Sequence, residues 1–311
     1  MTYRCDVHNM QQGDDRMFKI ISDGGCDFTK EEIVAHDIDV IPFYVSFDDE
    51  FLKVGTDITA EDFYQRLASD KGTFPKTSQP NPQDYIDVYT PHLKAGYNLL
   101  VLTVSSKLSG SYNSASIAAD LLKEEYPDRE IILIDSLSGS IAQGLILREA
   151  IKMRDAGYTL GKTAQLTRKV QATTQVYFTL DTIEYLKRGG RVGSTTAFVG
   201  NMLGLRPILH LVEGEVKQLD NVRGKKTILR MMQAALIEAL TDEKENIQLS
   251  IGHISSEKDA TTFKENTEGA LGIQINNPIT DVGAVIGAHA GPGALAFAYC
   301  KKYETLEGEI A

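Results

Sequence analysis

Hydroxyl side chains that could bind an anionic group are concentrated in two loops of the sequence. Residues 105–111 hold four of them, Ser105, Ser106, Ser109 and Ser111. A second loop at residues 72–82 (GTFPKTSQPNP) contributes Thr77 and Ser78. One serine at a helix start is usually an N-cap, but four exceed what a single helix start needs. Capping and ligand binding are therefore both open roles, and the serine loop is where we expect an anionic ligand.

A buried strand and an amphipathic helix must position the serine loop. Residues 98–104 (NLLVLTV) are mostly apolar, which is typical of a strand buried on both faces of a parallel sheet. Residues 112–123 have the 3.6-residue apolar rhythm of a helix, with an expected core face of Ile117, Leu121 and Leu122. Ligands of open α/β sheets bind outside the carboxyl ends of the strands. The serine loop is expected at that edge.

The first half of the chain alternates between strands and helices. Strands are expected at residues 18–22, 40–47, 98–104 and 130–135. The helices between them are expected to begin near Thr29, Thr59, Asn81, Tyr112 and Ser140. This alternation indicates a parallel sheet that is covered by helices on both faces.

The pattern changes after Gly157. Residues 207–212 and 215–219 flank Glu213-Gly214 as an antiparallel hairpin. Further strands are expected at residues 176–180, 247–254 and 273–276, mixed with helices at residues 159–169, 182–187 and 227–240. We predict a two-domain α/β protein, with residues 1–17 as a leader outside the fold. Residues 18–160 form an α/β domain with a mainly parallel sheet, and residues 161–311 form an α+β domain with a mixed or antiparallel sheet.

Composition excludes several classes of protein. The chain has 311 residues and a net charge of −11, which disfavours non-specific binding to nucleic acid or to an anionic membrane. Three widely spaced cysteines, Cys5, Cys26 and Cys300, indicate a reduced, cytoplasmic protein without a cysteine metal site. No apolar run is long enough for a signal peptide or a membrane span.

Five collinear segments carry a resemblance to a known family. They are residues 76–80 (KTSQP), 105–112 (SSKLSGSY), 185–191 (YLKRGGR), 223–226 (RGKK) and 289–294 (HAGPGA). In these segments the sequence resembles the DegV family of bacterial lipid-binding proteins, which includes the fatty-acid-binding subunits called FakB. Two positions depart from the family pattern. Asp23-Gly24-Gly25 replaces the usual Asp-Ser-Thr, which removes a hydroxyl, and Ser111 replaces the commoner Thr, which keeps one.

The resemblance implies a long-chain fatty acid buried between the two domains. It assigns the binding of the carboxyl group to Thr77, Ser109 and His289, with Ser78, Ser105 and Ser106 as secondary candidates. The family also implies that the carboxyl group is presented to a partner fatty acid kinase. Arg191 and Arg223, outside the pocket, then serve docking or phosphorylation. The chain is expected to be a monomer without catalysis, cofactor or metal of its own.

The same residues are open to other interpretations. Ser109 and His289 could belong to a stand-alone acyl hydrolase or esterase, but the Gly-x-Ser-x-Gly elbow is missing and no acid is assignable. A nucleotide-binding protein would need a GxGxxG or GxxxxGK[ST] motif, which the sequence lacks. A lone histidine such as His289 is more often structural, and only the collinear motifs favour a binding role. Lys187 and Arg188 also fit a helix end, whereas Arg191 lies beyond two glycines.

Overall fold

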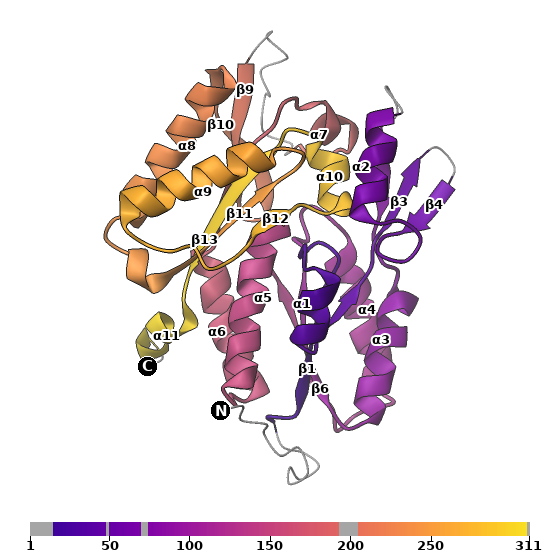
Figure 1. The fold of residues 1–311 in the computed structure, drawn as a ribbon. Helices are drawn as coiled ribbons and strands as arrows, with labels where there is room; N and C mark the ends of the chain where they lie inside the picture. Colours follow the sequence, from indigo (N-terminus) through magenta and orange to yellow (C-terminus); the bar gives the residue numbers. More distant parts are fainter. Residues whose placement is uncertain (1–14, 48–49, 70–73, 193–204, 310–311) are drawn as a thin grey trace.

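The computed structural model describes residues 15–47, 50–69, 74–192 and 205–309 (Figure 1). Its N-terminal sheet has the order β2-β1-β6-β7, and all neighbouring strands are parallel. The strands are β1 (Phe18–Asp23), β2 (Asp39–Ile41), β6 (Asn98–Thr103) and β7 (Ile131–Asp135). Every residue of β6 is buried, as the apolar run in the sequence predicts. The predicted parallel sheet is therefore confirmed.

Helices cover both faces of this sheet. Leu99 and Val101 of β6 pack with α3 (Pro82–Lys94) and α4 (Ser111–Lys123). Leu100 and Leu102, which point to the opposite face, pack with α5 (Ser140–Asp155) and α6 (Leu160–Thr173). The short helix α1 (Lys30–Ala35) begins with a complete capping box at Thr29, and α3 begins with Asn81 as N-cap and Pro82 in its first turn.

The C-terminal sheet has the order β10-β9-β8-β13-β11-β12 and is antiparallel except for the β11–β12 pair. Its strands are β8 (Gln175–Thr179), β9 (Leu205–Val212), β10 (Glu215–Arg223), β11 (Ile247–His253), β12 (Ile279–Asp281) and β13 (Leu295–Lys301). Helices α8 (Lys225–Leu240) and α9 (Glu257–Leu271) cover one face (Figure 1). Helices α5 and α6 lie against the other face and so pack between the two sheets. The predicted mixed sheet and the hairpin at Glu213-Gly214 are confirmed.

A third, three-stranded sheet has the order β4-β3-β5. It contains β3 (Tyr44–Phe47), β4 (Glu50–Lys53) and β5 (Lys76–Ser78), and it packs with α2 (Ala60–Ser69) and α10 (Ala284–Ala290). The prediction of one strand over residues 40–47 is wrong, because β2 ends at Ile41 and β3 begins at Tyr44 in a different sheet. Pro42 lies in the break and has no N–H to donate to a strand partner.

Two further expectations differ from the structure. Residues 273–276 form no strand, and the edge strand β12 lies three residues beyond them. On α4, Ile117 and Leu121 are 41% and 61% exposed, while Ala115, Ala118 and Leu122 are buried. The small alanines face the sheet and let the helix approach closely, so the buried face is rotated from the one that the large apolar residues suggested. Short helices α7 (Glu184–Arg188) and α11 (Tyr303–Leu306), with 3₁₀ turns at Lys244–Asn246 and Glu307–Glu309, complete the fold.

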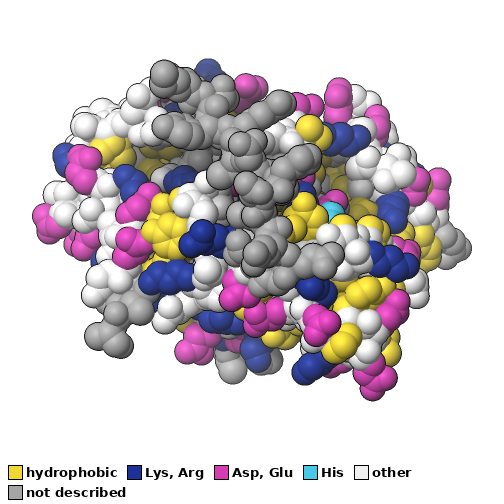
Figure 2. All heavy atoms as spheres, turned by 90° about the horizontal axis from the view of Figure 1, so that it is seen from below, with side chains coloured by type: hydrophobic (Ala, Val, Ile, Leu, Met, Phe, Trp, Pro, Cys, Tyr) yellow, Lys and Arg dark blue, Asp and Glu magenta, His cyan; other side chains and the backbone are white. Residues whose placement is uncertain are grey.

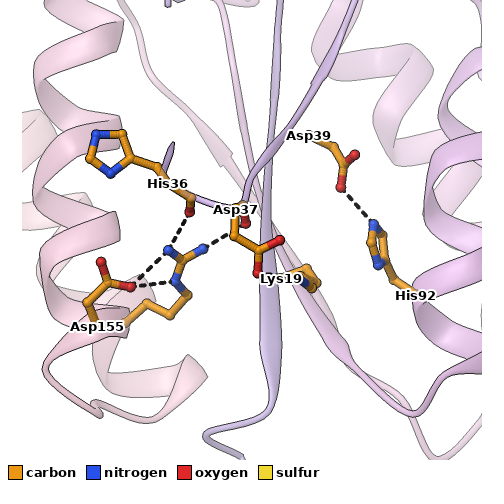
Figure 3. Close-up of polar contacts among 7 residues, drawn as sticks. Lys19, His36, Asp37, Asp39, His92 and Asp155 are labelled. Atoms are coloured by element: carbon orange, nitrogen blue, oxygen red, sulfur yellow. Dashed lines mark hydrogen bonds and ion pairs between the residues drawn. The ribbon is translucent and has the colours of Figure 1, made fainter. Parts of the chain in front are cut away.

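Polar contacts join helices α5 and α3 to residues 36–39, at the start of β2 (Figure 3). Arg154 of α5 donates to the carbonyl oxygens of His36 and Asp37 at 2.6 and 3.0 Å. His92 of α3 contacts Asp39 of β2 at 2.7 Å. These contacts join α5 and α3 to β2 and to the residues just before it, and so stabilise the N-terminal domain.

Charges of both signs are interspersed on the face shown in Figure 2, and no broad patch of a single sign is visible there. Among the described residues, no helix combines the length and the apolar character that crossing a bilayer requires.

Candidate functional site

A cavity lies between the strand-end loops of the N-terminal sheet and one face of the C-terminal sheet. It has about 1020 Å³ of empty space, counting the part that opens to solvent. The N-terminal part contributes residues from the loops after β1, β6 and β7, including Gly25, Val104 and Gly139. The cavity therefore lies at the carboxyl ends of the parallel strands, as expected from the sequence.

The C-terminal sheet forms the opposite wall. Its contributions come from β10, β9, β8, β13 and β11, namely Val216, Leu211, Val176, Phe178, Leu295, Ala296, Gly252 and His253. Val216 pairs with Leu211, which marks them as neighbours at the hairpin end of the wall. From β10 to β11 there are four strand spacings of about 4.8 Å, so the apolar wall is about 19 Å wide.

Polar side chains lie close together where β5, the serine loop before α4 and the C-terminal end of α10 meet. Thr77, Ser109 and His289, which come from these three segments, all line the cavity. Thr77 Oγ1 and His289 Nε2 are 2.8 Å apart and hydrogen-bonded. The exposure pattern of β5 alternates, so Thr77 is half-buried while Ser78 is exposed. The three residues to which the family resemblance assigns the carboxyl group thus line the same cavity.

Gln79 connects the two hydroxyl-bearing loops. Its Oε1 accepts a hydrogen bond of 2.8 Å from the N–H of Gly110. A Cβ at residue 110 would lie 2.4 Å from the Gln79 amide, so any larger residue there would displace the amide from this contact. Gln79 is two residues from Thr77 and Gly110 is next to Ser109, which means that this bond fixes the spacing of the two hydroxyls. Gln79 lies inside the KTSQP segment but was not among the predicted site residues.

His289 is held between Thr77 and Gly189. A Cβ at residue 189 would lie 2.1 Å from His289 Nδ1, so the glycine leaves the space for the ring. Nδ1 is buried and has no hydrogen-bond partner among the described residues. A proton on Nδ1 would therefore be an unsatisfied buried donor, and we assign the proton to Nε2, which donates to Thr77 Oγ1. The Thr77 hydroxyl proton is then available to a ligand.

Burial, with a smaller contribution from Arg191, lowers the pKa of His289 to about 4. The imidazole is accordingly neutral near pH 7. A neutral ring beside a neutral hydroxyl can satisfy a carboxyl group by hydrogen bonds without forming an ion pair with it.

Arg191 lies in the wall of the cavity, whereas the family resemblance implies a place outside the pocket. Its Nε donates to the carbonyl oxygen of Leu108 at 3.0 Å, and its Nη1 donates to that of Gly189. Burial lowers the pKa of Arg191. The side chain therefore connects the loop before Ser109 to Gly189, which lies against the His289 ring, and it brings a positive charge to the polar end of the cavity.

The remaining candidates lie elsewhere. Ser105 is fully buried, and its hydroxyl donates to the carbonyl oxygen of Gly214 at 2.9 Å, fastening the tip of the β9–β10 hairpin to the N-terminal part. Ser78 and Ser106 are exposed, and neither they nor Ser105 line the cavity. Arg223 is exposed at the end of β10.

Asp23 organises the loops behind the cavity. This buried residue at the end of β1 accepts hydrogen bonds from the N–H groups of Gly25 and Val104 at 3.1 and 3.0 Å. It also accepts from Ser111 Oγ at 2.6 Å and from Gln143 Nε2 at 3.0 Å. Burial raises the pKa of Asp23. Ser111 is therefore a structural residue, and the loops after β1 and β6 are joined to α4 and α5.

The geometry does not assemble a hydrolytic triad. His289 Nε2 is bonded to Thr77, and Ser109 Oγ accepts from the N–H of Ser111 at 3.2 Å. Within the described ranges, no hydrogen bond joins Ser109 to His289 and no carboxylate is bonded to His289. A nucleophile of the Ser-His-Asp type needs both contacts.

Comparison with known proteins gives consistent matches over most of the chain. A family model described as "Uncharacterised protein, DegV family" matches residues 17–302. A DegV domain-containing protein of Clostridium perfringens is 31% identical over 289 residues, which cover 90% of this chain and 96% of that protein.

Two solved structures are similar to this one. A protein of Eubacterium ventriosum described as binding stearic acid has a TM-score of 0.88 and 30% identity, and the match covers 93% of this chain and all of that one (100%). A DegV family protein of Thermus thermophilus, described with its fatty acid binding, has a TM-score of 0.82 and 28% identity, with 92% and 99% of the two chains covered.

Proposed function

Since the chain belongs to the DegV family, we propose that it binds a long-chain fatty acid in the cavity and presents the carboxyl group to a partner fatty acid kinase. The observation that carries this proposal is the contrast between a mostly apolar cavity wall and a polar end. Thr77, Ser109 and His289 lie at that end, with Arg191 beside them. The similar proteins of Eubacterium ventriosum and Thermus thermophilus, which are described as fatty-acid-binding, support the class of ligand.

The size of the wall suits a long acyl chain. A C–C bond of about 1.5 Å and a bond angle of about 111° give an extended chain a rise of about 1.25 Å per bond. The 19 Å wall then corresponds to a chain of about fifteen to sixteen carbons, at the strand spacing of about 4.8 Å.

Burial of the acyl chain supplies most of the affinity. Fourteen methylene groups that leave water contribute about 11 kcal/mol, at about 0.8 kcal/mol each. Association and ordering cost about 4 to 15 kcal/mol, so the polar end has only to satisfy the head group for binding to reach micromolar dissociation constants or tighter.

The polar end suits a carboxyl group that must remain reactive. Thr77 offers its hydroxyl proton, because its oxygen already accepts from His289, and Ser109 offers a second hydroxyl. Such neutral donors hold a carboxylate less firmly than a bidentate arginine would. The carboxylate therefore keeps the electron density with which it attacks a phosphoryl group.

Presentation to a kinase requires a surface beside the polar end, and we assign Arg191 and Arg223 to it. Arg191 is already bound to two backbone carbonyls, so its role is to position the head-group loops and to add positive charge. Arg223 is exposed and can contact a partner directly. A cytoplasmic, monomeric carrier without catalysis of its own agrees with this role.

Native mass spectrometry tests the binding step. Protein purified from a bacterial host should carry one ligand per chain, with the mass of a long-chain fatty acid. Ala296→Phe places a ring in the cavity wall and should release the ligand, while Gly269→Ala, which meets nothing within 4 Å, should retain it. A wild-type chain that carries no acid, or an acid that remains after Ala296→Phe, would contradict the proposal.

The kinase step has a separate test. Lipid-loaded protein, a bacterial fatty acid kinase and labelled ATP should yield acyl phosphate. Arg223→Ala should reduce the rate without changing fatty-acid affinity, and Arg230→Ala, an exposed arginine on the neighbouring helix α8, is the matched control. Equal rates for all three proteins would remove Arg223 from the kinase surface.

A further inference from the structure

The apolar cavity closes where helix α5 begins to pack against the C-terminal sheet. Ile141, the second residue of α5, lines the cavity and also belongs to the buried core between α5 and the sheet. Leu145, one helical turn further along the same face of α5, lies in this core but does not line the cavity. Ile141 is therefore the last residue of α5 at the cavity wall.

Strand β13 shows the same boundary. Ala296 lines the cavity, whereas Ala298, two residues further on the same face of the strand, is fully buried in the core that contains Leu145. Both side chains are small, which lets α5 approach the sheet closely at this point. The cavity thus closes between these two levels of β13.

Gly252 of β11 leaves the space that Ile141 occupies. A Cβ at residue 252 would lie 2.9 Å from Ile141 Cγ2 and 3.2 Å from Val282 Cγ2. The side chains of Ile141 and Val282 therefore both lie against the bare backbone of Gly252. Val282 comes just before α10, and from Gly283 to His289 this helix advances about 9 Å at 1.5 Å per residue. The closed end of the cavity is therefore at the opposite end of α10 from the head-group residues.

We propose that Ile141 sets the greatest length of acyl chain that the cavity accepts. This proposal rests on the proposed function and adds a specificity-determining residue to it. The core behind Ile141 is close-packed, so an acyl chain whose methyl end touches this side chain cannot extend past it. Each methylene group buried before this limit strengthens binding by about fourfold, and each one beyond it adds nothing.

The width of the cavity wall predicts where the limit falls. The wall of about 19 Å ends at β11, the strand that carries Gly252. At a rise of about 1.25 Å per C–C bond, this width corresponds to about sixteen carbons. Affinity should therefore increase with chain length up to about palmitic acid.

Competitive displacement of a fluorescent fatty acid by saturated acids from lauric to behenic acid tests the proposal. Wild-type affinity should rise by about fourfold per carbon up to about sixteen carbons and then stop rising. Ile141→Ala removes about three carbon atoms from a core that relaxes only partially, so the limit should move upward by about two to three carbons. Stearic acid should then gain about 15-fold over palmitic acid, relative to the wild type.

Two further variants separate a length limit from general loosening of the core. Leu145→Ala is the matched control, because it deletes equally many atoms from the same face of α5 away from the cavity. It should lower the stability and leave the length limit unchanged. Gly252→Ala should act in the opposite direction, because its methyl group pushes Ile141 toward the cavity. Palmitic acid should then lose about fourfold relative to lauric acid.

The length limit decides the outcome. If Ile141→Ala fails to fold, Ile141→Val, which deletes a single methyl group, should fold and move the limit upward by about one carbon. An unchanged limit in the folded Ile141 variant, or an equal shift in Leu145→Ala, overturns this inference alone. A wild-type protein that binds none of these acids overturns the proposed function together with it.

Discussion

A single methyl group at residue 189 should disable the polar end of the cavity. Gly189 has a φ of −72°, so alanine is compatible with the backbone. Its Cβ, however, would lie 2.1 Å from His289 Nδ1, and ordinary contact begins near 3.4 Å, so the ring would have to move by about 1.3 Å. Thr77 lies against the other ring nitrogen at 2.8 Å and blocks a straight retreat. The ring must turn out of its slot and lose its bond to Thr77.

The expected cost falls on the head group rather than on the acyl chain. Loss of the orienting hydrogen bond and of the ordered Thr77 hydroxyl is worth about 1 to 3 kcal/mol, which corresponds to about 5-fold to 150-fold in the dissociation constant. The acyl chain keeps its contribution of about 11 kcal/mol. Gly189→Ala should therefore still bind lipid, but with a weaker preference for the free acid.

Calorimetric titration with palmitic acid and with its methyl ester distinguishes these contributions. Gly189→Ala should weaken palmitic acid and leave the ester unchanged relative to the wild type. Gly161→Ala, in α6, meets nothing within 4 Å and is the control for a glycine-to-alanine change. Unchanged binding of palmitic acid would refute the role of His289. An equal loss for acid and ester would show that the substitution damages the whole cavity instead.

Three further predictions follow from the same contacts. Gln79→Leu removes the bond to Gly110 and should weaken fatty-acid binding several-fold in the displacement assay, while Gln83→Leu on the surface of α3 should not. Burial lowers the folded-state pKa of His289 to about 4, so the neutral ring contributes its full stabilisation above about pH 6.5. This stabilisation is lost as the pH falls toward 4. In urea titrations over that pH range, His289→Gln should therefore lose less stability than the wild type. Burial raises the folded-state pKa of Asp27 to about 7, so the stability of the wild type relative to Asp27→Asn should fall as pH rises from about 4 to 7, and a pH-independent difference would exclude a raised pKa.

Local patterns in the sequence predicted the parts of the fold that depend on local physics. The apolar run at residues 98–104 gives the buried strand β6, and the caps at Thr29 and Asn81 begin α1 and α3. The break at Pro42 was missed because the residues on either side of it, Val40, Ile41 and Phe43, are apolar, so one continuous strand appeared to satisfy the pattern. The buried face of α4 was predicted incorrectly because small alanines, which let the helix approach the sheet closely, are buried in place of the larger Ile117 and Leu121.

The site was predictable only as far as side-chain type and family motifs allow. Thr77 and His289 are 212 positions apart in the sequence, and no periodicity predicts their hydrogen bond. Ser105 looked like a ligand-binding residue because it shares a loop with Ser109, yet its partner is a carbonyl oxygen 109 positions away. Gln79 and Gly189 act by holding other groups in place, which only the three-dimensional contacts reveal.

A crystal structure of the protein loaded with 16-bromohexadecanoic acid tests the central claim most directly. The account predicts carboxylate oxygens within hydrogen-bonding distance of Thr77 Oγ1 and Ser109 Oγ, and an anomalous bromine peak among the apolar residues of the cavity wall. A bromine peak beside Thr77 and Ser109, or a ligand bound outside this cavity, would contradict it.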